Sequence, residues 1–211
     1  QLFALLGSAM ALGAIYLMAQ SPRGISMNTL LLAGVMIGII CGAVIPLIRF
    51  LAHPNYLVAM DRWMMGGLDV IGFRELAGLF PFLLPGVGLL FMQMSALNHL
   101  SLGEEMATGQ GVNVAAVQRI AFIAGSLSVA GVVSIAGPIF FVGLIVPHCV
   151  RRISGFDHRI VMPGTFLAGG AFLVFCDIFA RTIIAPTEMP VGIITAIIGG
   201  PFFIYLLIKK K

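Results

Sequence analysis

Long apolar blocks without charge dominate this 211-residue sequence, and short polar segments separate them. A transmembrane helix needs about 20 consecutive apolar residues, because a chain inside lipid must satisfy its own backbone hydrogen bonds. Charged residues make up 9% of the chain, whereas a water-soluble domain carries roughly 25%. This composition excludes a soluble globule and a disordered chain. It predicts an all-α fold, a polytopic transmembrane helical bundle.

Five apolar blocks are each long enough for one membrane span. They cover residues 2–19, 29–50, 75–94, 160–180 and 191–208. The stretch from 116 to 150 has arginines at both ends, so the chain must cross the membrane and return. It is short for two full crossings, and Gly131, Gly137 and Pro138 offer a break. We expect one full helix and a shorter returning helix, which makes seven crossings.

Basic residues set the expected orientation. Positive side chains favour the cytoplasmic side, so we expect a cytoplasmic C-terminus. The residues placed inside are Arg23, Arg119, Arg151, Arg152, Arg159 and Lys209 to Lys211, and those placed outside are Arg49, Arg62, Arg74 and Arg181. The formal net charge of +4 therefore needs no nucleic-acid partner.

Two polar loops interrupt the spans. Residues 53–75 form the outer loop, with a short interfacial helix whose Trp63 we place at the lipid headgroups. Residues 95–118 form the inner loop, which has neither Lys nor Arg and is predicted to hold two short helices. The helix signals are a capping box of Ser101 and Glu104, helix-ending Gly109 and Gly111, and Asn113 as the next cap.

Enzyme signatures are missing from the sequence. All three lysines are the last three residues, so no P-loop exists and any ATP hydrolysis belongs to another subunit. Hydrolase and metalloprotease motifs are also missing. His148 and His158 are isolated, and we expect loop or core roles for them rather than a metal site. We predict neither cofactor nor metal, and no enzymatic activity.

Three features leave alternatives open. Asp177 and Arg181 lie four residues apart, so they either neutralise each other or leave Arg181 for an acidic partner outside. Glu104 and Glu105 mark either a solvated turn or a docking surface for a basic partner. A ridge of small residues serves either packing within one subunit or a pore or dimer face, and it consists of Gly34, Gly38 and Gly42.

Several segments together resemble one family. Residues 137–164 (GPIFFVGLIVPHCVRRISGFDHRIVMPG) and 177–210 look like the permease subunit of bacterial ABC importers for iron siderophores, haem and vitamin B12, the FecCD type. The resemblance continues through LGEEMATGQGV (102–112), WMMGGL (63–68) and LLLAGVMIGIICGA (30–43). It spans nearly the whole chain in the right order.

The resemblance implies a type II importer permease with ten spans, of which this sequence holds the last seven as a single domain over residues 1–211. The Asn-Pro-Leu-Ala segment of the family is missing, so we expect an N-terminally truncated chain. The implied setting is the bacterial inner membrane. The implied partners are a second permease subunit, in a homodimer or a related heterodimer, two cytoplasmic ATPase subunits, and a periplasmic or lipid-anchored binding protein.

The resemblance also implies roles for single residues. The ATPase contact falls on Gly103, Glu104 and Glu105, and Arg181, in its ARTIIAPTEMP context, meets a carboxylate of the binding protein. Gly199, Gly200 and Pro201, with the ridge at 34–42, lie on spans that resemble pore-lining helices. The expected mechanism is alternating access driven by the ATPases. The alternative is an ion-gradient-driven secondary transporter or channel, which normally shows midplane carboxylates, whereas Asp177 lies near the end of a span.

Overall fold

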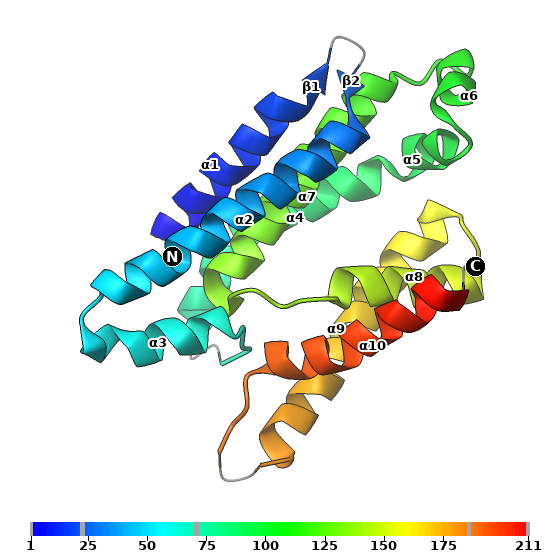
Figure 1. The fold of residues 1–211 in the computed structure, drawn as a ribbon. Coiled ribbons are helices and arrows are strands. Elements are labelled where there is room, and N and C mark those ends of the chain that lie inside the picture. The colour runs from blue at the N-terminus through cyan, green and yellow to red at the C-terminus, as the bar shows by residue number, and fades with distance from the viewer. Residues whose placement is uncertain (1, 22–23, 70–71, 185–186, 210–211) are drawn as a thin grey trace. The chain divides into compact units, whose positions relative to one another are not determined.

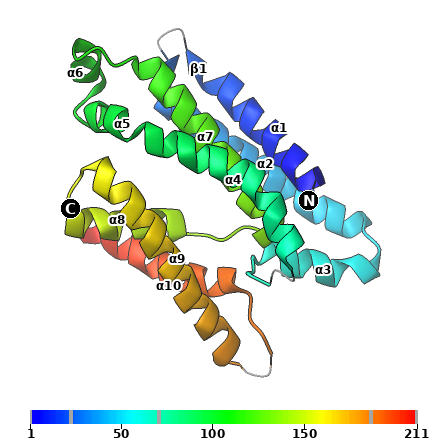
Figure 2. The ribbon, with the colours of Figure 1, turned by 180° about the vertical axis from the view of Figure 1, so that it is seen from behind.

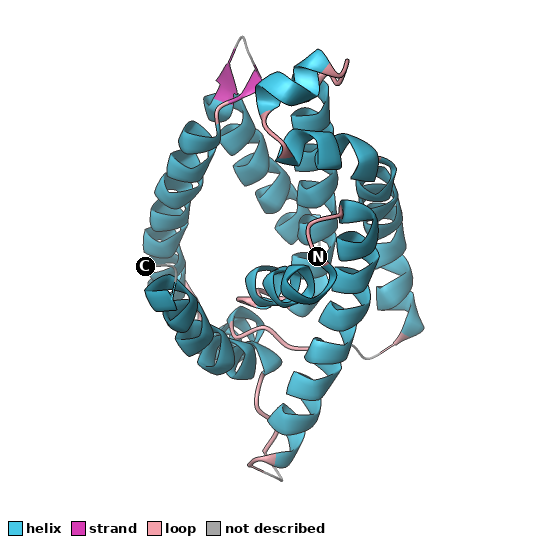
Figure 3. Ribbon diagram, turned by 90° about the vertical axis from the view of Figure 1, so that its right-hand side faces the viewer, coloured by secondary structure: helices cyan, strands magenta, loops and turns pink. Residues whose placement is uncertain are grey.

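The computed structural model describes residues 2–21, 24–69, 72–184 and 187–209. Helices form most of this part of the chain (Figure 1), and the strands, drawn in magenta in Figure 3, are two residues each. The predicted all-α helical bundle is therefore confirmed. Arg23, Lys210 and Lys211, which the orientation prediction uses, lie outside the described residues.

The chain divides into two compact units, each described by itself. Unit 1 consists of Gln1–Met60 and Leu76–Ile135, and unit 2 consists of Asp61–Glu75 and Ala136–Lys211. Helix α3 (Pro54–Met64) lies across one boundary. It is the short helix predicted in the outer loop, and Trp63 in its last turn is partly exposed.

Apart from α3, the helices before the break at residue 137 lie wholly or mainly in unit 1. They are α1 (Leu2–Ala19), α2 (Met27–Leu51), α4 (Phe73–Met92), α5 (Met94–Ser101), α6 (Glu104–Gly109) and α7 (Val114–Ala136). The strands β1 (Gln20–Ser21) and β2 (Gly24–Ile25) pair antiparallel and connect α1 to α2. Figures 1 and 2 show α1, α2, α4 and α7 running side by side.

Small residues bring α4 and α7 together. A Cβ added to Gly131 of α7 would lie 2.9 Å from Cβ of Phe82 on α4. A Cβ added to Gly86 of α4 would overlap the Ser128 hydroxyl of α7. Such positions let two helix backbones approach closely. Tyr16 of α1 stacks on Phe122 of α7 with ring centroids 5.8 Å apart, so α7 has neighbours on two sides.

Unit 2 is built on α8 (Val142–Ser154), α9 (His158–Thr182) and α10 (Val191–Lys209). A three-residue turn joins α8 to α9, and Asp157 caps α9 by accepting a hydrogen bond from the Arg159 amide at 2.9 Å. Four buried residues of α9 and α10 form its core: Cys176, Ala180, Val191 and Ile194.

A break at residues 137–141 separates α7 from α8. Gly137 adopts φ +68, which removes it from the helical conformation, and Pro138 follows it. Helix α7 has 23 residues and α8 has 13. The expectation of one long and one shorter helix is confirmed. Of the three residues proposed for the break, Gly131 instead stays inside α7, where it packs against α4.

Three described helices, α2, α7 and α9, are long and apolar enough to cross a membrane. Leu76–Met92 and Met94–Ser101 meet at a bend of 53° and count as a fourth span if taken together, while α1 and α10 contain shorter apolar helices. Within their most apolar windows, the share of residues buried inside the protein is 6% for α2, 22% for α7 and 11% for α9. Such apolar, uncovered surfaces require lipid or partner subunits around them.

Candidate functional site

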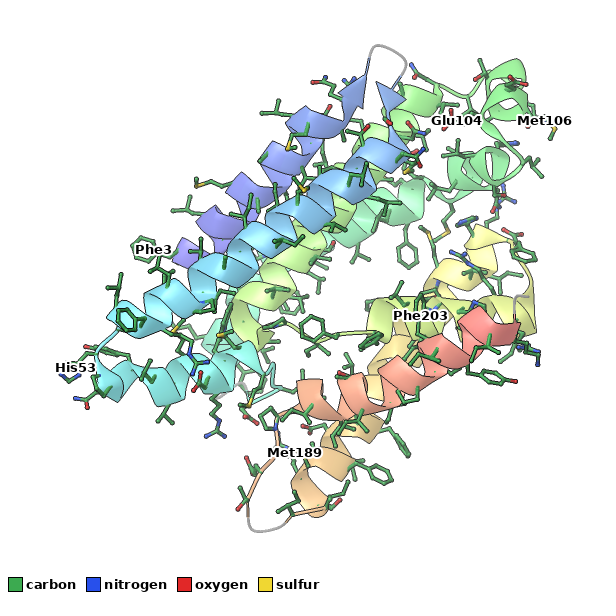
Figure 4. All side chains as sticks on the ribbon, in the orientation of Figure 1. Phe3, His53, Glu104, Met106, Met189 and Phe203 are labelled. Atoms are coloured by element: carbon green, nitrogen blue, oxygen red, sulfur yellow. The ribbon has the colours of Figure 1, made fainter. Side chains whose placement is uncertain are left out.

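Helix α6 presents the acidic surface expected in the inner loop. Gly103 precedes it with φ +114, a conformation that favours glycine, and Glu104 and Glu105 occupy its first turn. Both carboxylates are exposed, and Figure 4 shows Glu104 and Met106 on this short helix. Met106 and Leu102 are more than half exposed beside the carboxylates. Acidic and apolar side chains therefore share one exposed surface.

Two links attach α6 to α7. The Gln118 side chain donates a hydrogen bond to Glu104 Oε1 at 2.8 Å, and Gln118 itself is buried. The Val112 amide donates to the Ala107 carbonyl at 3.0 Å, and Ala107 is fully buried. A force on α6 therefore reaches the start of α7 through a side chain and through the backbone.

The helix ends and caps predicted around α6 are confirmed in part. Helix α6 ends at Gly109, and Asn113 Oδ1 accepts from the Ala116 amide at 3.0 Å at the start of α7, as predicted. The capping box is wrong. Ser101 is the last residue of α5, and its hydroxyl donates to the Asn98 carbonyl at 2.7 Å, so it is not at the N-cap of α6. Gly103 takes the N-cap position instead.

Arg181, near the end of α9, is surrounded by carboxylates. Its Nε donates to Asp177 Oδ2 at 2.9 Å, which is the predicted pair four residues apart. Its Nη2 donates to Asp69 Oδ1 at 3.3 Å, and its Nη1 lies 3.5 Å from Glu188 Oε1. Arg62 Nη2 lies 3.3 Å from Asp69 Oδ2, which extends the cluster. We name these five residues the Arg181 cluster.

Sequence reasoning missed Asp69 and Glu188. Asp69 is 112 positions from Arg181, so helix spacing gives no signal for that contact. A weak signal existed for Glu188, because it lies in the ARTIIAPTEMP segment that carries Arg181. The Arg181 guanidinium joins the end of α9, the segment after α3 and the connection to α10 within unit 2. The contact between Asp177 and Arg181 is present, and docking of a partner stays a prediction.

The predicted glycine positions divide into packed and open ones. Gly199 is buried, and a Cβ there would overlap the Phe141 side chain. Phe141 has φ +66, which is unusual for a residue other than glycine, and it precedes α8. Among the described residues nothing lies within 4 Å of a Cβ added at the remaining positions, Gly34, Gly38, Gly42 and Gly200. Pro201, inside α10, is exposed.

Backbone hydrogen bonds from glycine amides hold unit 2 together at the break. The Gly67 amide donates to the Ala136 carbonyl at 2.9 Å, and the Gly192 amide donates to the Gly66 carbonyl at 3.0 Å. A Cβ on Gly137 would overlap the carbonyl oxygen of Trp63, in the last turn of α3, and a Cβ on Gly192 would overlap that of Met65, just after α3. The segment after α3 is thus fixed to the end of α7 and to the start of α10.

A metal site has no support among the residues that the structure describes, since no group of three His, Cys, Asp or Glu side chains there could hold an ion. His148 lies edge-on to the Phe202 ring with centroids 6.4 Å apart, which is a packing contact between α8 and α10.

Comparisons with known proteins match nearly the whole chain. A family model described as the FecCD transport family matches residues 1–209. The hemin transport system permease protein HmuU of Yersinia pestis is 34% identical over 208 residues, which cover 99% of this chain and 62% of that protein. The vitamin B12 import system permease protein BtuC of Yersinia pseudotuberculosis is 36% identical over 203 residues, 96% of this chain and 60% of that protein.

A third relative and a solved structure agree. An uncharacterized ABC transporter permease protein, YvrB of Bacillus subtilis, is 39% identical over 185 residues, 88% of this chain and 52% of that protein. A structure described as an inward-facing conformation of a metal-chelate type ABC transporter matches with a TM-score of 0.85 and 31% identity, over 97% of this chain and 65% of that one. The chain thus spans 52% to 62% of the length of these three relatives.

Proposed function

Because the chain belongs to the FecCD transport family, we propose that it acts as the membrane permease of an ATP-binding cassette importer. The match of the family over residues 1–209 carries this proposal. The cargo is an iron chelate (siderophore), haem or cobalamin, and it crosses the bacterial inner membrane. The names of the relatives, which include hemin and vitamin B12 permeases, support this range of cargo without selecting one member.

Its partners are a second permease subunit, two ATPase subunits and a soluble receptor that delivers the cargo. The ATPases contact α6 at Gly103, Glu104 and Glu105. The exposure of both carboxylates beside Met106 supports such a contact, because docking surfaces combine charged and apolar groups. Movement of the ATPases reaches α7 through the Glu104–Gln118 hydrogen bond, which supports alternating access of the cargo path.

The receptor docks at Arg181, on the opposite side of the membrane from α6. The half-exposed guanidinium at the end of α9 supports this role, since an arginine recognises carboxylates with good geometry. The second permease subunit or the cargo path lies against two open faces of the chain. One is at Gly34, Gly38 and Gly42, and the other is at Gly200 and Pro201. The open space around the four glycines supports a role other than packing within the described chain.

Uptake into proteoliposomes tests the proposed function. The full-length permease is reconstituted with its ATPase and receptor, and ferric siderophore, haem and cobalamin are offered separately. We expect ATP-dependent uptake of one class, which a hydrolysis-deficient ATPase abolishes. Uptake that continues without any ATPase would contradict the proposal and would favour the ion-gradient-driven transporter.

A further inference from the structure

Each nitrogen of the Arg181 guanidinium faces a different carboxylate. Nε pairs with Asp177 at 2.9 Å, Nη2 with Asp69 at 3.3 Å and Nη1 with Glu188 at 3.5 Å. A docking carboxylate needs donors on this same group. Asp177 and Asp69 take two of its five N–H donors, and the Nη1 end that a partner carboxylate would approach faces Glu188 at 3.5 Å.

The three carboxylates are not held equally. Asp177 and Asp69 accept hydrogen bonds from the guanidinium, whereas Glu188 makes the longest ion pair. The Glu188 side chain is 51% exposed, compared with 25% for Asp177 and 41% for Asp69. An exposed ion pair of this kind contributes little to stability. Glu188 is thus the contact that is easiest to replace.

The backbone at Glu188 need not move for this replacement. The next residue, Met189, labelled in Figure 4, packs against the core of unit 2. Its amide donates to the Ala180 carbonyl at 3.2 Å. Rotation of the Glu188 side chain alone would uncover Nη1, while Asp177 and Asp69 keep the guanidinium in place.

We propose that Glu188 occupies the position on Arg181 that a receptor carboxylate takes on docking, so that one carboxylate is exchanged for another. This inference rests on the proposed function. The exchange leaves the number of carboxylates in contact with the guanidinium unchanged, because the receptor carboxylate replaces that of Glu188. Asp69 and Asp177 act as positioning residues that preset the guanidinium for its partner, and Glu188 limits the affinity of the free site.

Binding of the importer's own soluble receptor tests the exchange. The full-length permease, assembled with its ATPases in nanodiscs, is titrated with labelled receptor in the wild type and in Glu188→Gln, Arg181→Gln and the double variant. We expect Glu188→Gln to tighten binding by about two- to fivefold, which is the range for loss of an exposed competing pair. We expect Arg181→Gln to weaken binding. Receptor concentrations extend to about a hundredfold above the wild-type Kd, so that a weakening of binding by up to about a hundredfold can still be measured.

The double variant separates exchange from general charge effects. If Glu188 competes for Arg181, the Glu188→Gln change has no effect once Arg181 is replaced. An equal gain in both backgrounds would mean long-range repulsion and would overturn the exchange, as would unchanged or weaker binding by Glu188→Gln alone. Wild-type binding by Arg181→Gln would instead overturn the docking role of Arg181 in the proposed function. Thermal unfolding of each assembled variant verifies that it is folded.

Discussion

Gly192 and Gly200 lie on the same helix, and their surroundings differ. A Cβ on Gly192 would overlap the Met65 carbonyl oxygen, whereas open space surrounds Gly200 within the described chain. We expect Gly192→Ala to destabilise the protein by about 1–3 kcal/mol, the range for overpacking against groups that cannot rotate away. Gly200→Ala is the control and should be neutral or stabilising by up to about 1 kcal/mol, from helix propensity. Thermal unfolding of the purified permease measures both, and equal effects would contradict the backbone contact.

Single residues also show what the sequence could and could not predict. The Asp177–Arg181 pair follows from helix spacing and was predicted. Asp69 and Glu188 were missed, because their contacts with Arg181 depend on how three segments meet in space. Gly199 was predicted as a candidate, but its neighbour Phe141 was not, since the sequence does not tell which side chain faces a glycine.

At the scale of elements, α6 is the part whose function is most directly testable. We expect replacement of Glu104 and Glu105 by lysine to weaken co-purification of the ATPase, because two favourable charges become repulsive. Replacement of the same pair by glutamine is the matched control and should have a smaller effect. Hydrogen exchange of the α6 amides shows whether the helix persists without the Glu104–Gln118 link. Unchanged assembly and unchanged stimulation of ATP hydrolysis would refute the contact.

Element boundaries were predictable where a local signal decides them. Gly137 and Pro138 interrupt the helix, and Asn113 caps α7. The capping box failed because Ser101 also fits the last turn of a preceding helix, where its hydroxyl donates to a carbonyl of that turn. The bend at Gln93 was not predicted, although the expected span ended one residue later, at 94.

The order of the helices along the chain determines on which side of the membrane α6 and the connection before α10 lie. Between α6 and the connection before α10 lie three helices, α7, α8 and α9. If each crosses the membrane, the two segments lie on opposite sides. The 13 residues of α8 span only about 20 Å at 1.5 Å per residue, which is less than the hydrocarbon core, so the residues flanking α8 must complete this crossing. Arginines lie near the start of α7 and at the end of α8, and they favour a return of the chain to the cytoplasm.

Labelling of single cysteines tests this arrangement. The background carries Cys41→Ala and Cys149→Ala, and Cys176 stays because it is buried. With a membrane-impermeant maleimide on spheroplasts, we expect Thr187→Cys to react at once and Glu105→Cys to react only after permeabilisation, since an odd number of crossings separates these exposed positions. Reaction of both in detergent is the control for accessibility. Labelling of Glu105→Cys in intact spheroplasts would place α6 outside, away from any cytoplasmic ATPase, and the importer mechanism proposed for this chain would fail.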